Sequence, residues 1–497
     1  MKNAYTALNE HLAPVYDLRA AAAVLQWDQE VCMPPKGTKE RSNQLSTLSE
    51  IAHGRFISPE TENLIAALEN ATASAPYESD ERSLARVVRR DYDQSAKIPS
   101  SLVAEQARLA AQSFTAWVDA RERNDYAAFA PWLEKSVDLA RKIADCIGYE
   151  NHPYEALFFL YEPGITVAEL DLLFAPLAKE IPPLLEAAVE KAAGTSYPVF
   201  QGTFDPAKQK AFTETLLAAI GFDFSRGRQD PSAHPFTTTF SSGDVRVTNR
   251  FSAADPFGGI FGALHEGGHA LYEQGVPEKY DRTTLFGGTT LGVHESQSRL
   301  WENFVGRGHH FWKHYYPLLI ETFPDALRGI ALDDFVKLAN RVEPGLIRVE
   351  ADELSYNLHI FIRYDLEKRM IEGSLPVKEL PGEWNRLYKA LLGVTVPDDR
   401  DGCMQDVHWS HGSFGYFPTY TVGNIIAAQL FDAAKKALPS LEEDFSRGDF
   451  APLLAWLREN IHVHGRKFTA PEMVTRVTNE KIDPGYLIRY LKDKFGR

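Results

Sequence analysis

The chain has 497 residues, 44% of them hydrophobic, which is enough for a large buried core. Its formal charge of −15 argues against a nucleic-acid-binding protein, because the phosphate backbone selects basic surfaces. Three cysteines that lie far apart in the sequence, Cys32, Cys146 and Cys403, fit a reducing compartment better than a disulfide framework.

Helical patterns dominate the first half of the chain. The apolar run from Ala20 to Leu25 is too short for a signal peptide, and no stretch approaches the ~20 apolar residues that a membrane-spanning helix needs. From Glu40 to about Ala218 one amphipathic helix follows another, and strand signals are nearly missing. We therefore predict a mainly α, multi-helix fold and a cytoplasmic protein.

The clearest strand pair is Pro235 to Phe251, PFTTTFSSGDVRVTNRF. In this stretch β-branched and aromatic residues flank a turn at Ser241-Ser242-Gly243-Asp244, which is the pattern of a β-hairpin. An edge strand beside a metal site can hold the backbone of a peptide by strand addition. A purely structural hairpin fits the same pattern.

A metal-binding motif follows in Phe261 to Gly275, FGALHEGGHALYEQG. His265 and His269 are four residues apart, so on a helix both imidazoles face one ion, with Glu266 beside them. Two such histidines with a neighbouring glutamate are typical of zinc peptidases, in which the glutamate takes a proton from the attacking water. We therefore expect a zinc site on a buried helix.

Glycines mark two places near this motif. Gly267 and Gly268 each cost up to about 1 kcal/mol inside a helix, and we expect them to let a substrate backbone pass close. The stretch from Val276 to Val293 has a glycine-rich centre, which indicates a mobile loop near the site.

The spacing alone does not fix the third metal ligand. The long metalloprotease signature requires Gly and His at the third and sixth positions after the second ligand, where this chain has Tyr272 and Gly275. A glutamate on a following helix is the remaining common solution. We favour Glu295, which opens the next helical segment, and Glu302, two turns further on, is the competitor.

Two later segments are rich in polar residues, IRVEAD at 347–352 and GCMQDVHW at 402–409. The planar fork of Arg348 matches a carboxylate, although most arginines merely pair on a surface. His408 could donate to a developing oxyanion, or it could be an ordinary packed side chain.

Six segments occur in one order along the chain: HPF at 234–236, DVRVT at 244–248, HEGGH at 265–269, HESQ at 294–297, IRVEAD and GCMQDVHW. Together they resemble the carboxypeptidase Taq family. The stretch from Trp27 to Leu48 resembles the N-terminal region of that family, so the likeness covers nearly the whole chain. The resemblance implies an almost all-helical zinc-peptidase fold with a deep central cleft, usually a homodimer, and removal of C-terminal residues with broad preference.

For the metal, the resemblance makes His265, His269 and Glu295 the ligands of one divalent ion and Glu266 the general base. Zinc is the expected ion, and a site with two histidines and one carboxylate also accepts cobalt.

For the substrate, the resemblance makes Arg348 the residue that binds the C-terminal carboxylate. It places His408 in a substrate-side motif and offers Tyr420 as a second candidate for oxyanion stabilisation. His234 and Arg246 belong to two of the shared motifs, either as further substrate-binding residues or as part of the scaffold.

The whole chain, 1–497, is thus expected to be a single catalytic unit. A helical part of about 1–230 would form one wall of the cleft, and 231–497 would bind metal and substrate. The leading hypothesis is a metal-dependent carboxypeptidase acting on peptides, and a metallo-oligopeptidase or endopeptidase is the alternative. A metal-buffering or peptide-binding protein without turnover is a third reading, against which Glu266 argues, because metal binding alone needs no base.

Overall fold

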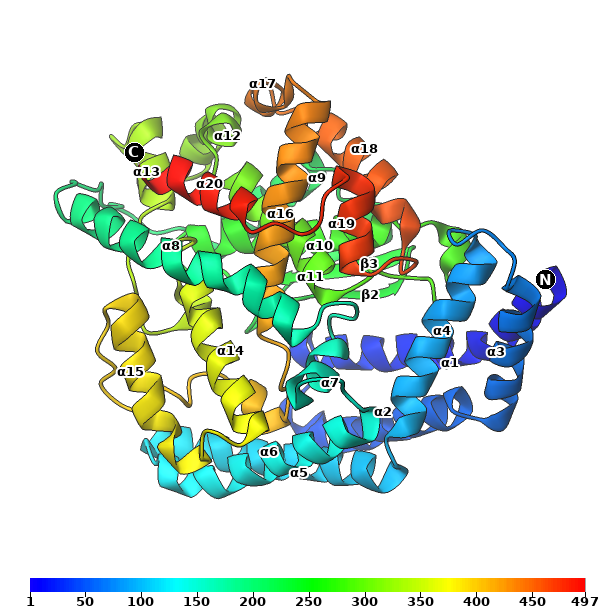
Figure 1. Ribbon diagram of the computed structural model, residues 1–497. Helices are drawn as coiled ribbons and strands as arrows, with labels where there is room; N and C mark the ends of the chain where they lie inside the picture. The colour runs from blue at the N-terminus through cyan, green and yellow to red at the C-terminus, as the bar shows by residue number, and fades with distance from the viewer. Residues whose placement is uncertain (497) are drawn as a thin grey trace. The chain divides into compact units, whose positions relative to one another are not determined.

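Helices form nearly all of the regular structure, as the sequence predicts. The computed structural model describes residues 1–496, and these contain twenty α-helices and one three-stranded sheet. Figure 1 shows the order of these elements by colour. Within the described residues no helix combines the length and the apolarity that crossing a lipid bilayer requires.

The chain divides into two compact units, each made of three stretches. Unit 1 contains Met1–Ser95, Tyr197–Ala339 and Leu430–Asn479. Unit 2 contains Ala96–Ser196, Asn340–Gln429 and the described part of Glu480–Arg497. The expected division into two parts near residue 230 stays a prediction. It does not coincide with these compact units, since each unit takes residues from both sides of that point.

Unit 1 carries the sheet and most of the helices. Its helices are α1 Lys2–Val31, α2 Thr38–Phe56, α3 Pro59–Thr72, α4 Asp80–Lys97, α9 Pro206–Ala219, α10 Phe257–Gly275, α11 Leu291–Arg299, α12 His309–Thr322, α13 Leu332–Ala339, α17 Leu441–Ser446, α18 Ala451–Asn460 and α19 Ala470–Thr478. The first four bury apolar residues in one cluster that includes Leu12, Phe56 and Leu84. Ser58 starts α3 by accepting a hydrogen bond from the N–H of Thr61.

Unit 2 is helical throughout. Its helices are α5 Ser100–Arg123, α6 Tyr126–Ile147, α7 Pro153–Phe159, α8 Val167–Ala193, α14 Tyr356–Glu372, α15 Leu380–Leu392, the start of α16 Pro418–Ala437, and α20 Gly485–Phe495. A capping box of Thr166 and Glu169 begins α8, which runs on through three prolines. Two short 3₁₀ turns, Arg348–Glu350 and His408–His411, carry the polar segments singled out from the sequence.

The sheet has the strand order β1-β3-β2. β2, Thr237–Ser241, pairs antiparallel with β3, Asp244–Asn249, so the predicted hairpin is confirmed. β1, Gly227–Pro231, pairs parallel with β3 and was not predicted. Its sequence, GRQDP, lacks the alternation of apolar residues that marks a strand.

Helix α10 packs against α11 and also against β2 and β3 (Figure 1). A Cβ atom on Gly268 would lie 2.5 Å from the carbonyl oxygen of Gln297, and one on Gly267 would lie 2.6 Å from Leu217 Cδ2. These glycines therefore make room for α11 and α9. The expectation that they give space to a substrate backbone is wrong.

Candidate active site

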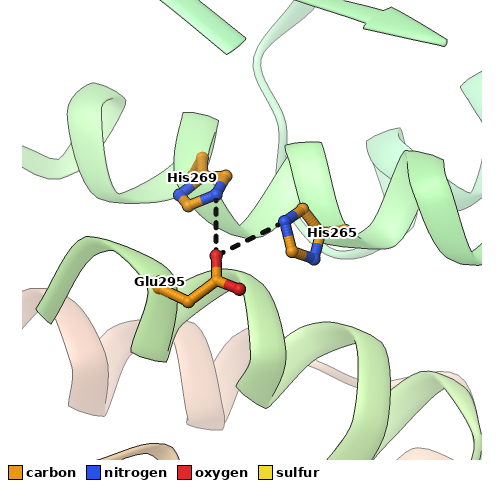
Figure 2. Close-up of side chains that lie close together, drawn as sticks. All are labelled: His265, His269 and Glu295. Atoms are coloured by element: carbon orange, nitrogen blue, oxygen red, sulfur yellow. Dashed lines mark ion pairs between the residues drawn. The ribbon is translucent and has the colours of Figure 1, made fainter. Parts of the chain in front are cut away.

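Three of the predicted residues converge between α10 and α11 in unit 1. His265 and His269 lie one turn apart on α10, and Glu295 lies on α11. Oε2 of Glu295 is 3.5 Å from Nε2 of His265 and 3.4 Å from Nε2 of His269, so both imidazoles point at one carboxylate oxygen (Figure 2). The three donor atoms lie within 4.8 Å of one another.

The carboxylate of Glu295 is held in place from its own helix. Arg299 Nε donates to Oε1 of Glu295 at 2.7 Å, and the hydroxyl of Ser298 donates to Oε2 at 2.9 Å. Burial alone would raise the pKa of Glu295, but Arg299 and the two histidines hold it well below its usual range. Glu295 is therefore an ionised, fixed group that faces two imidazoles.

The second ring nitrogen of each histidine has its own partner. Nδ1 of His265 lies 2.9 Å from Oε2 of Glu302, and Nδ1 of His269 lies 2.5 Å from Nδ1 of His294. Glu302, in a π-helical turn that continues α11, thus contacts the far nitrogen of His265 and not the shared face. The geometry separates the two glutamates that the sequence left as alternatives.

The two imidazoles differ in their proton affinity. Burial lowers the pKa of His269 to about 3, and His294 and His265 add to this effect. Burial also acts to lower the pKa of His265, but Glu295 and the hydrogen bond with Glu302 raise it. His269 is therefore a neutral imidazole with a lone pair to offer.

This donor set fits a small divalent cation. Metal–ligand distances of about 2.1 Å in a tetrahedral site require donors about 3.4 Å apart. The separations of 3.5 and 3.4 Å between Glu295 and the two histidines match that requirement. Two imidazole nitrogens and one carboxylate oxygen are also ligands that zinc takes in catalytic sites.

Glu266 lies between the two histidines in sequence and is 7% exposed. The hydroxyl of Thr237, the first residue of β2, donates to Oε2 of Glu266 at 2.7 Å. Burial raises the pKa of the Glu266 carboxyl, and Glu295 acts in the same direction. The carboxylate is thus both oriented and more basic than an exposed glutamate.

In unit 2, Arg348 belongs to a buried ionic cluster. Its Nε and Nη2 atoms both donate to Oδ1 of Asp406, at 3.0 and 2.9 Å. Arg363, which is fully buried, donates to Oδ2 of the same carboxylate at 2.7 Å. Burial would raise the pKa of Asp406, but the two arginines hold it far below its usual value. We call Arg348, Arg363 and Asp406 the arginine cluster.

His408 and Tyr420 lie beside this cluster. The ring of His408 is 4.4 Å from that of Phe417, and the guanidinium carbon of Arg348 is 5.3 Å from the ring of Tyr420. Burial lowers the pKa of His408 to about 4, so its imidazole is neutral. Its Nδ1 is buried and has no hydrogen-bond partner among the described residues.

Arg246 and His234 lie at the sheet in unit 1. The guanidinium of Arg246 pairs with the Asp244 carboxylate at 2.8 and 2.9 Å and stacks on the ring of Trp27, 4.3 Å away. His234 is exposed in the turn before β2, and its carbonyl accepts a hydrogen bond from Ser232.

Several residues at these sites were not predicted from the sequence, among them Thr237, Glu273, His294 and Arg363. Glu273 lies one turn beyond His269 in the same helix, and His294 precedes Glu295, so their positions carried a usable signal. Thr237 and Arg363 reach their partners only through contacts between distant segments.

The comparisons with known proteins agree with this geometry. The family model of the carboxypeptidase Taq (M32) metallopeptidases matches residues 7–495. Thermostable carboxypeptidase 1 of Thermus thermophilus is 39% identical over 502 residues, which cover 99% of this chain and 98% of the relative. Carboxypeptidase 1 of Bacillus subtilis is 38% identical over 96% of this chain and 94% of its own.

A solved structure of similar shape points the same way. The crystal structure of the M32 carboxypeptidase from Deinococcus radiodurans superposes with a TM-score of 0.95 at 38% identity, covering 99% of each chain. With a donor set that fits a divalent ion and full-length likeness to carboxypeptidases, the protein is a metal-dependent carboxypeptidase that belongs to the carboxypeptidase Taq (M32) metallopeptidase family.

Proposed function

We propose that His265, His269 and Glu295 bind the catalytic ion, zinc, and that the enzyme removes C-terminal residues from peptides with broad preference. The observation that carries this proposal is the convergence of the three donor atoms within 4.8 Å. An ion at this position would polarise the scissile carbonyl and lower the pKa of water.

Glu266 is the general base of this proposal. Its buried carboxylate accepts the proton of the attacking water, and the raised pKa makes it a stronger base than an exposed glutamate. Thr237 keeps Oε2 engaged at 2.7 Å and so fixes the direction in which the other oxygen points.

Arg348 binds the terminal carboxylate of the peptide. Its fork toward Asp406 is already occupied, so the attraction comes from charge that remains unbalanced in the arginine cluster. Two buried guanidinium groups share one aspartate, and a substrate carboxylate would neutralise the excess.

His408 and Tyr420 are the proposed oxyanion donors. A neutral imidazole can donate one hydrogen bond. The buried Nδ1 of His408 has no hydrogen-bond partner among the described residues, so it is available to donate to the oxyanion. Tyr420 is the second candidate, because its phenolic O–H can donate a hydrogen bond and its ring lies near Arg348.

His234 and Arg246 complete the proposed substrate side in a weaker role. Because Arg246 is paired with Asp244 and stacked on Trp27, we assign its contribution to the shape of the sheet that carries Thr237. His234 is exposed and would contact the peptide itself.

A digest of mixed peptides, read by mass, tests the activity. The metal-loaded enzyme should shorten peptides one residue at a time from the C terminus, and C-terminal amidation should slow it. Internal cleavage of both free and amidated peptides would instead identify a metallo-oligopeptidase, which the family membership does not favour.

Three further expectations remain predictions. We propose that the whole chain acts as one catalytic unit, that it forms a homodimer, and that it works in the cytoplasm, where its three free cysteines would stay reduced. Sedimentation analysis of the purified protein tests the homodimer, which requires a mass of twice 55.7 kDa.

A further inference from the structure

A partly buried chain of hydrogen bonds continues from the second ring nitrogen of His269. Nδ1 of His269 lies 2.5 Å from Nδ1 of His294, and Nε2 of His294 lies 2.7 Å from Oε1 of Glu273. Glu273 is 6% exposed and lies one helical turn beyond His269 on α10. The three side chains thus form one connected path that ends on a buried carboxylate.

The protons along this path follow from which atoms can donate. An ionised Glu273 only accepts, so Nε2 of His294 must carry the proton between them. When His294 carries only this one proton, its Nδ1 is a lone pair that accepts from Nδ1 of His269. The lone pair of His269 is left on Nε2, the atom that lies 3.4 Å from Glu295.

We infer that Glu273 and His294 are positioning residues that hold His269 in the tautomer and orientation needed to bind the metal ion. Imidazoles that ligate metals generally donate their other N–H to a partner, which fixes the tautomer and strengthens the ligand. Here that partner is a second imidazole, which is itself held by a carboxylate.

The glycine-rich loop before α11 closes over this path. The N–H of Gly288 donates to Oε1 of Glu273 at 3.0 Å, and the N–H of Thr289 donates to the hydroxyl of Tyr272 at 3.2 Å. A Cβ atom on Gly288 would lie 2.5 Å from Cδ2 of His294. The loop therefore supplies a wall against which the His294 ring packs, and only glycine fits there.

His265 is supported in a simpler way. Its Nδ1 lies 2.9 Å from Oε2 of Glu302, which also pairs with Arg299 and Arg307. The two proposed ligands thus have different partners, one a carboxylate and the other an imidazole. A substitution on one path should affect one ligand and spare the other.

The inference rests on the proposed function, in which His265 and His269 bind the ion. Full-length protein loaded with Co²⁺ provides the test, because the paramagnetic ion shifts the N–H protons of bound imidazoles away from other NMR signals. We expect two solvent-exchangeable, shifted resonances from the wild type. His294→Phe, which keeps a ring without nitrogens, should remove one of them and weaken Co²⁺ binding by about 10- to 100-fold.

Three further variants distinguish an effect on the partners of His269 from a general effect on the folded protein. Glu302→Gln should disturb the other resonance. Glu273→Gln should act in the same direction as His294→Phe with a smaller loss, and it preserves the test if the phenylalanine variant does not fold. Glu367→Gln is the matched control, since Glu367 is also buried and accepts a glycine N–H, from Gly415, but lies in unit 2. It should leave both resonances and the Co²⁺ affinity unchanged.

Two results would contradict these assignments, and they are distinguishable. The positioning role is overturned if both His294→Phe and Glu273→Gln keep both resonances and bind Co²⁺ within about twofold of the wild type. The proposed ligand set itself fails, and the positioning role with it, if His269→Ala binds Co²⁺ as tightly as the wild type.

Discussion

The metal centre of unit 1 and the arginine cluster of unit 2 bury charge with opposite balance. Four buried carboxylates lie around the two histidines: Glu266, Glu273, Glu295 and Glu302. The guanidinium groups of Arg299 and Arg307 pair with two of them, Glu295 and Glu302. In the arginine cluster, two guanidinium groups face a single aspartate. One group carries an excess of negative charge and the other an excess of positive charge.

Buried charge that lacks a partner is costly, so each excess indicates the ligand that would complete the group. The negative excess suits a divalent cation, and the positive excess suits the carboxylate at the end of a peptide. Under the proposed function, the first group would hold the metal ion and the second would bind the terminal carboxylate of the peptide. Substitutions that change the net charge of one group and not that of the other therefore test this comparison.

The largest effect is expected from Glu266→Gln. The amide is nearly isosteric but cannot accept a proton, so kcat should fall by about 10²- to 10⁴-fold. Metal content, measured by atomic absorption, should stay at the wild-type level, because Glu266 is outside the proposed ligand set. Activity within about tenfold of the wild type would show that Glu266 is not the general base.

The next largest effect separates the two glutamates of the metal centre. Glu295→Ala removes one of three ligands and should weaken metal binding by about 10²- to 10³-fold. Glu302→Ala removes a partner of His265 and should cost about 10- to 100-fold. Chelator competition measures both values, and the reverse ranking would make Glu302 the ligand.

A smaller effect concerns Glu367, a buried carboxylate in unit 2. It accepts hydrogen bonds from Tyr154, Trp409 and the N–H of Gly415, and so ties down the segment that carries His408. Burial raises its pKa from 4.5 to about 7 despite these donors. The folded protein therefore binds this proton more tightly than the unfolded chain does.

Because of that difference, the free energy of unfolding should fall as the pH rises from about 5 to 7, by ~1 kcal/mol per pH unit, and level off above 7. Glu367→Gln cannot titrate and should lose this component of the slope. Denaturant titrations at several pH values measure it. Glu372→Gln, an exposed position at the end of the same helix, is the control and should keep the slope.

Much of the metal centre could be predicted from the sequence, because several of its residues lie close together along the chain. The i, i+4 pair of His265 and His269 fixes two donors on one helical face. The arginine cluster could not be predicted, since Asp406 meets Arg348 and Arg363 only after segments 58 and 43 residues apart have packed together. The glycines of HEGGH were misread for a related reason: the helices that need their space come from elsewhere in the chain.

The most direct test of the opposite charge balance in the two groups is to measure kcat/KM of Arg348→Ala on a peptide with a free C terminus and on its C-terminal amide. A charge-assisted pair contributes about 1.5 to 3 kcal/mol, so the free peptide should lose roughly tenfold to a few hundredfold. The amide, which lacks the charge, should lose much less, and metal content should not change. Arg348→Lys should recover only part of the loss, because lysine keeps the charge but cannot reproduce the paired hydrogen bonds of Nε and Nη2 with Asp406. Equal losses on the free and amidated peptides would contradict the claim that the positive excess of the arginine cluster recognises the terminal carboxylate.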